Sequence, residues 1–374
     1  MQIPVNSPLI TTEDIAAVVA ALEDGWISGD GPVVSGFEEA MAASVGRKHA
    51  ISVSNGTVAI DLAISALTFE TGDEIIVPSF TIISVINQIL RDGLKPRFVD
   101  CDPLTWNMKI DEVEKLINPR TRAIIAVHTY GLPVDMNPLL KIAAEYNLVI
   151  IEDASEAHGL RYDEKICGSF GLMSTFSFYA NKHITSGEGG MIMTDDDAIA
   201  ERLRSLKNLC FVPSRRFVHD EIGWNGRMSS LQCALAHSQL KRLPTILSRR
   251  REIAAKYIQQ LSDEKYLQLP LMETEHGLND FWVFGVVLVG KLSQQSDVVR
   301  MELDKVGVGN RPFFWSLHEQ PVLKKFGIVP TEKCPVTENI ARSGFYIPNS
   351  LAITDEQITY VCDKLKGVCN EYLR

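Results

Sequence analysis

A lysine at position 182 lies between an alternating run of small and aromatic residues and a glycine-rich loop, in the stretch "FYANKHITSGEGG" (178–190). The flanking runs "STFSF" and "MIMT" have the pattern of short strands. Lys182 could be a solvated turn residue, a phosphate clamp or a covalent catalyst. The motif GxxxxGK[ST] places its lysine after the glycines, whereas here the glycines follow, so the phosphate-clamp interpretation fails. A buried amine with a lowered pKa could instead form a Schiff base with a carbonyl compound.

A second candidate is the carboxylate of Asp153 in "IIEDASEAHG" (150–159), at the end of an apolar strand. A lone carboxylate in such a place is costly unless it is paired, and a protonated ring nitrogen would be a suitable partner. The structural alternative is that Asp153 caps the following helix. Glu156, one helical turn further on, would reach a ring hydroxyl or face solvent.

A third candidate is the turn in "VSNGTVAIDL" (53–62), where Gly56 and Thr57 open a predicted helix. The free N–H groups and the dipole of a helix start favour a phosphate dianion. An isolated "NGT" is also an ordinary turn. The order of the three features along the chain, with the Gly/Thr turn first, the strand-end aspartate second and the lysine third, is more specific than any one of them. The lysine, the carboxylate and the phosphate cradle together match the needs of pyridoxal 5'-phosphate. The predicted cofactor-binding residues around this turn are Ser54, Asn55, Gly56, Thr57 and Ser177.

Strands that alternate with helices must position these groups. Over residues 46–196 this alternation predicts a mostly parallel, doubly wound α/β sheet. Ligands gather at the carboxyl ends of the strands in such sheets, and Asn55, Asp153 and Lys182 all lie at or just past strand ends. A long polar helix in "LKRLPTILSRRREIAAKYIQQL" (240–261) would lead into a second, smaller domain. We predict a large domain over residues 1–243, including the N-terminal segment, and a small C-terminal α+β domain over 244–374.

The composition excludes several classes of function. The net charge of −10 and the pI near 5.4 argue against nucleic-acid or anionic-membrane partners. Seven single cysteines without a CxxC pair indicate neither a zinc site nor a disulfide framework, and no metal is expected. They fit a reducing compartment. The first residues lack the pattern of a signal peptide, and the longest apolar stretch is too short for a membrane span, so a soluble cytoplasmic protein is expected.

The motifs "VSNGT", "IIEDASEAHG", "STFSFYANKHITSGEGGMIMT" and "IGWNGRMSSLQCALAHSQL" resemble those of the DegT/DnrJ/EryC1/StrS family of sugar aminotransferases. The resemblance runs over almost the whole chain. It implies a pyridoxal-phosphate enzyme of fold type I, with a mostly parallel seven-stranded sheet between helices. Lys182 would form the Schiff base and move a proton, while Asp153 and Glu156 would contact the ring. Asn225 would reach the phosphate of a neighbouring subunit, which implies a homodimer with shared active sites.

The chain most resembles members that aminate C4 of GDP-4-keto-6-deoxy-mannose to GDP-perosamine for surface polysaccharides such as the O-antigen of lipopolysaccharide. The amino donor would be L-glutamate, which leaves as 2-oxoglutarate. A UDP- or dTDP-linked keto sugar, amination at C3, and a non-catalytic cofactor-binding regulator remain open. A 3-dehydratase of the family has histidine in place of Lys182, and no GxGxxG motif supports a dinucleotide binder.

Substrate contacts are expected from residues with weaker signals. Arg215 and Arg216 could bind a diphosphate or lie solvated in a polar loop. His318 could contact the sugar nucleotide or be a packed histidine. The predicted substrate-binding residues are Trp26, Ser28, Asn181, His183, Arg215 and His318.

The sequence departs from the family at several positions. Ile82 stands where relatives usually carry an aromatic residue that stacks on the cofactor ring. Gly226 replaces a usual tyrosine beside Asn225, and Cys210 falls where glycine is common. We expect these departures to affect substrate choice more than chemistry.

Overall fold

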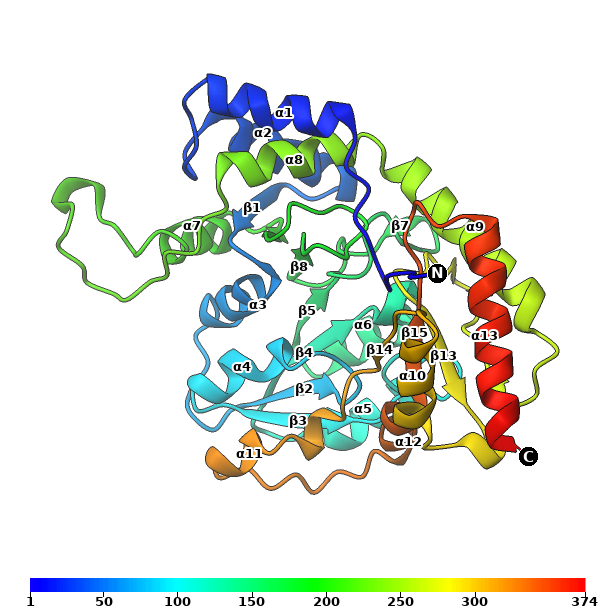
Figure 1. Ribbon diagram of the computed structural model, residues 1–374. Coiled ribbons are helices and arrows are strands. Elements are labelled where there is room, and N and C mark those ends of the chain that lie inside the picture. The colour runs from blue at the N-terminus through cyan, green and yellow to red at the C-terminus, as the bar shows by residue number, and fades with distance from the viewer. Residues whose placement is uncertain (374) are drawn as a thin grey trace.

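A central seven-stranded sheet organises the first two thirds of the chain in the computed structural model, which describes residues 1–373 (Figure 1). The strand order is β1-β9-β8-β5-β4-β2-β3. Neighbours from β8 to β3 are parallel, whereas β9 is antiparallel to both β8 and β1. The predicted mostly parallel seven-stranded sheet is therefore confirmed. Its strands are β1 (His49–Val53), β2 (Glu74–Pro78), β3 (Lys95–Val99), β4 (Thr121–Val127), β5 (Val149–Asp153), β8 (Met173–Ser177) and β9 (Gly190–Thr194).

Both faces of this sheet are buried, as the nearly continuous apolar runs of its strands require. In β4, Ile124 and Ala126 pack into one core, whereas Ile125 and Val127 pack into the other. Helices α2, α5, α6 and α8 contribute to the first core, and α3, α4 and α7 contribute to the second. The helices of this part are α1 (Thr12–Glu23), α2 (Pro32–Val45), α3 (Gly56–Ser65), α4 (Ser84–Arg91), α5 (Ile110–Leu116), α6 (Met136–Glu145), α7 (Asp197–Leu206) and α8 (Ser230–Leu240).

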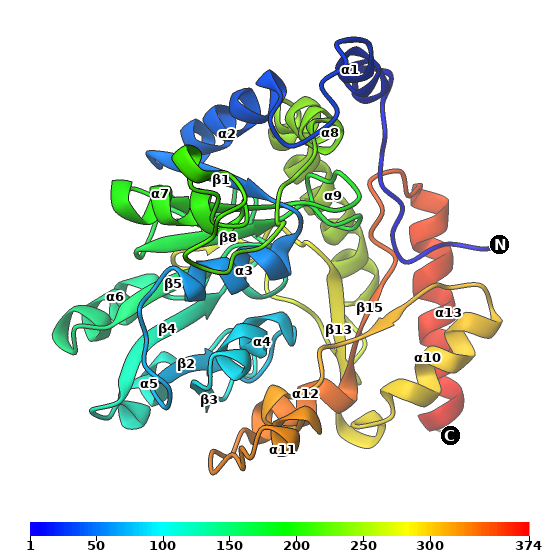
Figure 2. The same ribbon diagram turned by 90° about the vertical axis from the view of Figure 1, so that its left-hand side faces the viewer.

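A second, four-stranded antiparallel sheet in the order β10-β13-β15-β14 forms the centre of the remaining chain. The apolar stretch around Trp282 enters this sheet as its buried strand β13. Figure 2 shows this sheet beside the large one, with α10 and α13 on its outer side. The helices and strands of this part of the chain are α9 (Leu243–Leu261), β10 (Leu267–Gln268), β13 (Phe284–Leu288), α10 (Ser296–Lys305), β14 (Arg311–Pro312), α11 (Val322–Lys325), α12 (Pro335–Ser343), β15 (Gly344–Ile347) and α13 (Asp355–Leu373).

Short elements complete the chain between these layers. They are β6 (Arg161–Tyr162), β7 (Lys165–Ile166), β11 (Glu273–Thr274), β12 (Gly277–Leu278) and the 3-10 turns η1 (Thr129–Gly131), η2 (Pro213–Arg215), η3 (Gly290–Leu292) and η4 (Leu317–Glu319). Within residues 1–373, no helix combines the length and the apolar character that a membrane crossing needs.

The first residues of the chain lie against the C-terminal part of the molecule, whereas α1 packs against α8 beside the large sheet. Ile3 forms a bridge with Val308, and its N–H donates to the Gly307 carbonyl at 2.9 Å. The Asn349 N–H donates to the Val5 carbonyl at 3.1 Å. Both views place the N-terminus beside the elements of the smaller sheet (Figures 1 and 2). The boundary at 243/244 stays a prediction, although α9 begins there.

Candidate active site

The cavity that holds the predicted catalytic residues lies at the carboxyl ends of the central strands. It has a volume of about 680 Å³, and we call it the lysine cavity. Asp153 ends β5, Ser177 ends β8, and Gly56 begins α3 after β1. Because the carboxyl ends of parallel strands meet at one edge, residues far apart in the sequence converge here. The predicted site residues that line it are Asn55, Gly56, Thr57, Ile82, Asp153, Glu156, Ser177, Asn181 and Lys182.

Lys182 lies in the loop between β8 and β9, where its N–H donates to the Tyr179 carbonyl at 2.9 Å. Its side chain is only 9% exposed, and its Nζ lies 3.5 Å from Glu156 Oε1. The same atom lies 3.7 Å from the centroid of the Trp282 ring. Burial lowers the pKa of Lys182, and the neighbouring carboxylates of Glu156 and Asp153 oppose that shift. A buried amine with a lowered pKa is a better nucleophile and proton carrier than a solvated one.

Glu156 is the carboxylate closest to this amine. Burial raises its pKa from 4.5 to about 7, while Lys182 and the Tyr130 N–H hold it lower than burial alone would. The Tyr130 N–H donates to Glu156 Oε2 at 2.8 Å. Tyr130 follows β4 in a left-handed conformation, with φ of 56°, which is strained for a residue with a side chain. The strained turn aims this donor at Glu156.

Asp153 is 3% exposed and lines the lysine cavity from the end of β5. Its Oδ1 accepts from the Ser155 N–H at 3.1 Å and from the Thr175 hydroxyl at 3.4 Å. Within residues 1–373, no lysine, arginine or histidine lies close enough to form an ion pair with it. A buried carboxylate without such a pair fits a cationic ligand group, such as a protonated ring nitrogen.

The first turn of α3 lines another part of the cavity. Asn55 Oδ1 accepts from the Val58 N–H at 2.9 Å, which leaves the earlier N–H groups of the helix for a ligand. A Cβ on Gly56 would lie 2.8 Å from Ser177 Cβ, so only glycine allows this close approach. The Thr57 and Ser84 hydroxyls lie 2.7 Å apart beside this turn. The arrangement fits a phosphate group.

The donor set therefore fits pyridoxal phosphate on all three counts: a buried amine, an unpaired buried carboxylate and a helix start with hydroxyls. Ser54 is the exception among the predicted phosphate residues, because it does not line the cavity and its N–H donates to the Gly226 carbonyl at 2.8 Å. No cluster of His, Cys, Asp and Glu that could hold a metal ion is found in the described part of the chain.

The sequence analysis did not predict the aromatic residues that line the lysine cavity. Trp282 comes from the segment before β13, and its Nε1–H donates to the Asn181 carbonyl at 2.9 Å. This bond connects the C-terminal part of the chain to the lysine loop. The stretch "FWVFG" carries no local signal for this role, since it has the pattern of a buried strand. The aromatic residues that line the cavity are Tyr179, Trp224, Trp282, Phe314 and Tyr346.

Two predicted substrate residues are packed away from the cavity. His318 Nδ1 lies 2.7 Å from the Ser79 hydroxyl, and its Nε2 lies 3.2 Å from Glu338. His183 is 2% exposed, and burial holds its pKa well below 6.5. Neither histidine lines the lysine cavity, and their substrate contacts stay predictions.

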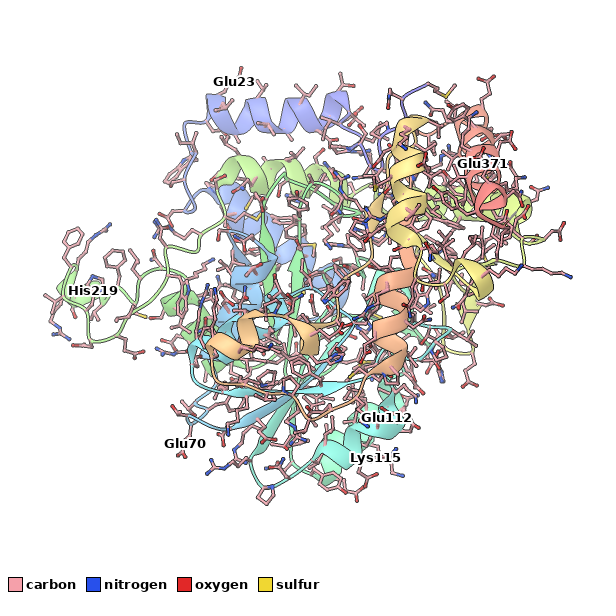
Figure 3. All side chains as sticks on the ribbon, turned by 60° about the horizontal axis from the view of Figure 1, so that its bottom comes forward. Glu23, Glu70, Glu112, Lys115, His219 and Glu371 are labelled. Atoms are coloured by element: carbon pink, nitrogen blue, oxygen red, sulfur yellow. The ribbon has the colours of Figure 1, made fainter. Side chains whose placement is uncertain are left out.

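Four other predicted residues lie on the surface and do not line the lysine cavity of their own chain: Trp26, Ser28, Arg215 and Asn225. Arg215 forms an ion pair with Asp220 at 2.6 Å. Both belong to a loop that projects from the body of the molecule, with His219 at its far end (Figure 3). The roles of these residues stay predictions.

Solved structures of known proteins have the same fold as this chain. The fold and the cavity define an enzyme of the pyridoxal-phosphate-dependent aminotransferase class. The structure of the aminotransferase TlmJ from Streptoalloteichus hindustanus is similar, with a TM-score of 0.92 and 27% identity over 100% of both chains. A GDP-4-keto-6-deoxymannose-3-dehydratase with a trapped PLP–glutamate geminal diamine gives a TM-score of 0.89 at 26% identity, over 97% of this chain and 100% of that one.

The chain belongs to the DegT/DnrJ/EryC1/StrS aminotransferase family, whose model matches residues 8–366. It is 35% identical to GDP-perosamine synthase of Escherichia coli O157:H7 over 363 residues, which are 97% of both chains. It is 37% identical to GDP-perosamine synthase of Caulobacter vibrioides over 367 residues, which are 98% of both chains. The protein is a sugar aminotransferase that uses pyridoxal 5'-phosphate, as the sequence predicted.

Proposed function

We propose that the enzyme transfers the amino group of L-glutamate to C4 of GDP-4-keto-6-deoxy-mannose and yields GDP-perosamine. The name shared by the two relatives supports the sugar, and the trapped glutamate in the dehydratase supports the donor. The observation that carries the proposal is the buried amine of Lys182, 3.5 Å from Glu156 in a cavity that also holds an unpaired carboxylate.

In this proposal, each residue of the site has its own role in the reaction. When bound, pyridoxal phosphate supplies an electron-withdrawing ring that weakens the C–H bond beside the reacting amine. The Lys182 amine would take up that proton and later give it back, because its lowered pKa lets it exist in the neutral form. Asp153 would hold the ring nitrogen protonated, and Glu156 would hold the lysine in place. The first turn of α3 and Ser177 would bind the phosphate.

The same proposal includes a homodimer with shared active sites. Asn225, Arg215 and Trp26 do not line the cavity of their own chain, and Figure 1 shows the loop that carries Arg215 reaching far from the body. Exposed apolar side chains on this loop, Phe217 at 76% and Ile222 at 93%, support its burial against a partner. In the dimer, Asn225 and Arg215 of one subunit would meet the phosphate and diphosphate in the other.

A cytoplasmic role in surface polysaccharide synthesis, such as the O-antigen of lipopolysaccharide, completes the proposal. All seven cysteines are free and buried, which fits a reducing compartment. The proposed substrate also fits the cytoplasm, because sugars are linked to nucleotides at the expense of nucleoside triphosphates, which are found there.

The test is a panel of GDP-, UDP- and dTDP-linked 4-keto-6-deoxy sugars, each incubated with the enzyme and L-glutamate and read out by mass spectrometry. We expect the GDP-linked sugar to gain an amino group fastest, with Lys182→Ala as the inactive control. Faster amination of a UDP- or dTDP-linked sugar would reject the proposed substrate. Failure to aminate any sugar, with cofactor bound, would favour the regulator alternative.

A further inference from the structure

The lysine cavity extends past the phosphate cradle, along α3 and toward α4. Its lining on α3 runs from Gly56 to Asp61, and its lining on α4 includes Ser84 and Arg91. The two helices pack side by side on one face of the large sheet (Figure 2). Asp61 comes five residues after Gly56, which is roughly 7.5 Å along the helix axis. We call the part of the cavity at Asp61 and Arg91 the aspartate end.

Asp61 is a buried carboxylate with one unsatisfied oxygen. It is 2% exposed, and its Oδ1 has no hydrogen-bond partner in the described part of the chain. Burial raises the pKa of Asp61 to about 6, the Arg91 charge opposes that shift, and the neighbouring Asp92 adds to it. The amino transfer itself gives this carboxylate no role. Because a buried acceptor without a donor is costly, a ligand that brings an N–H or O–H group would compensate it.

Arg91 places hydrogen-bond donors next to this acceptor. Its NH1 donates to Asp61 Oδ2 at 3.1 Å, which uses one of the five N–H groups of the guanidinium. The side chain of Arg91 is 59% exposed, whereas that of Asp61 is 3% exposed. The remaining donors of Arg91 are therefore accessible to a carbonyl oxygen. The aspartate end thus offers a carboxylate and a guanidinium side by side.

Trp224 adds an aromatic surface close to α3. A Cβ on Gly226 would lie 3.0 Å from Val58 Cγ1 and 3.6 Å from Trp224 Cβ, so this tryptophan comes near the first turn of the helix. Trp224 lines the lysine cavity and packs against the same core as α3 and α4. An aromatic side chain near a paired acceptor and donor suits a flat heterocycle, whose face stacks while its edge forms hydrogen bonds.

We propose that Asp61 and Arg91 bind the edge of the guanine base of the substrate, and that Asp61 thereby selects GDP over UDP or dTDP. The inference rests on the proposed function, in which the substrate is a GDP-linked sugar. Guanine presents three adjacent groups on this edge, the donors N2–H and N1–H and the acceptor O6. Asp61 Oδ1 accepts from N2–H and Oδ2 accepts from N1–H, which places O6 on the side of Arg91.

The other common bases do not match this pair of residues. Uracil and thymine present one N–H between two carbonyl oxygens, so one oxygen of Asp61 would face a carbonyl instead of a donor. Adenine and cytosine present an acceptor nitrogen beside their amine. A site built for hydrogen bonds rejects a ligand that leaves its polar groups unpaired. The sugar, diphosphate and ribose span more than the separation between Gly56 and Asp61, so the reacting carbon can stay beside Lys182.

The test is Asp61→Asn, which keeps the shape of the side chain and replaces one acceptor with a donor. Xanthosine diphosphate carries a carbonyl oxygen where GDP carries the N2 amine, so it matches the amide of this variant. Arg91→Met removes the second partner, and because Arg91 is exposed it tests the site even where Asp61→Asn fails to fold. Asp92→Asn is the matched control, because Asp92 accepts from the Gln88 amide at 2.8 Å and does not line the lysine cavity.

The measurement is the Kd of GDP, UDP, dTDP and xanthosine diphosphate for the cofactor-loaded enzyme, by isothermal titration calorimetry. We expect the wild type to bind GDP most tightly. In Asp61→Asn, the Kd of GDP should rise roughly ten- to a hundredfold, because hydrogen bonds to a charged group are lost. The same variant should bind xanthosine diphosphate more tightly than GDP. Arg91→Met should weaken GDP roughly two- to tenfold without that gain, and Asp92→Asn should behave as the wild type does.

The gain for xanthosine diphosphate is the result that a purely structural role of Asp61 would not produce. Equal weakening of all four nucleotides in Asp61→Asn, or unchanged GDP binding in Arg91→Met, would overturn the subsite while leaving GDP as the nucleotide. An unchanged Kd of GDP in Asp61→Asn, with a shift from dimer to monomer in size-exclusion chromatography, would overturn it in favour of a contact with a second copy of the chain. A wild type that prefers UDP or dTDP would instead reject the proposed substrate, and the guanine ligand with it.

Discussion

Lys182 Nζ lies 3.5 Å from Glu156 Oε1 and 3.7 Å from the centre of the Trp282 ring. The amine is therefore held between a carboxylate from the large sheet and an indole from the segment that enters the smaller one. Burial moves the two titrating groups in opposite directions, because it lowers the pKa of the lysine and raises that of the glutamate. Both shifts favour the neutral forms, which proton transfer requires.

Replacing Glu156 with Gln should change how stability depends on pH. The pKa of Glu156 is raised from 4.5 to about 7 in the folded chain, so the folded state binds this proton more tightly than the unfolded state. Its contribution to stability is greatest below pH 4.5 and is lost as the pH rises to about 7. The wild type should therefore lose on the order of 3 kcal/mol relative to Glu156→Gln across that window.

Thermal unfolding of the cofactor-free enzyme at a series of pH values measures this difference. Glu252→Gln is the control, because exposed ion pairs lower the pKa of Glu252 to about 2. Its effect has the opposite sign and is lost only as the pH falls below 4.5. A constant Tm difference between wild type and Glu156→Gln from pH 4.5 to 7 would contradict the raised pKa.

Replacing Gly56 with Ala should weaken the phosphate cradle. The new Cβ would meet Ser177 Cβ at 2.8 Å, so the helix start must move away from β8. We expect a loss of about 1–3 kcal/mol in stability and weaker cofactor binding. The control is Gly36→Ala in α2, whose Cβ would meet its nearest neighbour, His237, at 3.8 Å. That variant should gain about 0.5–1 kcal/mol, because alanine favours the helix. Equal effects of the two substitutions would argue against the close approach.

Replacing Ile82 with Phe should strengthen cofactor binding. Ile82 is 45% exposed and lines the lysine cavity, so a ring has room to cover the cofactor. Stacking should improve the Kd roughly two- to tenfold in an absorbance titration. Ile83→Phe, at a neighbour that is 37% exposed and lies outside the cavity lining, should leave the Kd unchanged. An unchanged or weaker Kd in Ile82→Phe would show that this side chain does not cover the ring.

Mixing two inactive variants should restore activity if the sites are shared. In a heterodimer of Lys182→Ala and Asn225→Ala, one site carries both defects and the other carries neither. An equal mixture should therefore recover roughly a quarter of the wild-type activity after subunit exchange. Activity that stays at the level of the separate variants would place Asn225 in the site of its own chain.

The sequence could predict the part of the site that the large sheet positions. Asp153, Ser177 and Gly56 follow from strand ends and a helix start, because parallel strands bring such ends to one edge. These features depend on neighbours in the sequence.

The contributions of distant segments could not be predicted. Trp282 reaches the lysine cavity from the segment before β13, and no local pattern encodes that contact. His318 was selected for its motif, but Ser79 and Glu338 bind both of its ring nitrogens. The bridge of Ile3 to Val308, which brings the first residues to the C-terminal part of the molecule, likewise has no local signal in the sequence.

The most direct test of this account is the intact mass of the enzyme after borohydride reduction, followed by peptide mapping. The buried amine predicts one reduced phosphopyridoxyl adduct per chain, on the peptide that contains Lys182, and none in Lys182→Ala. An adduct on another lysine, or cofactor that leaves the reduced protein on denaturation, would contradict the account.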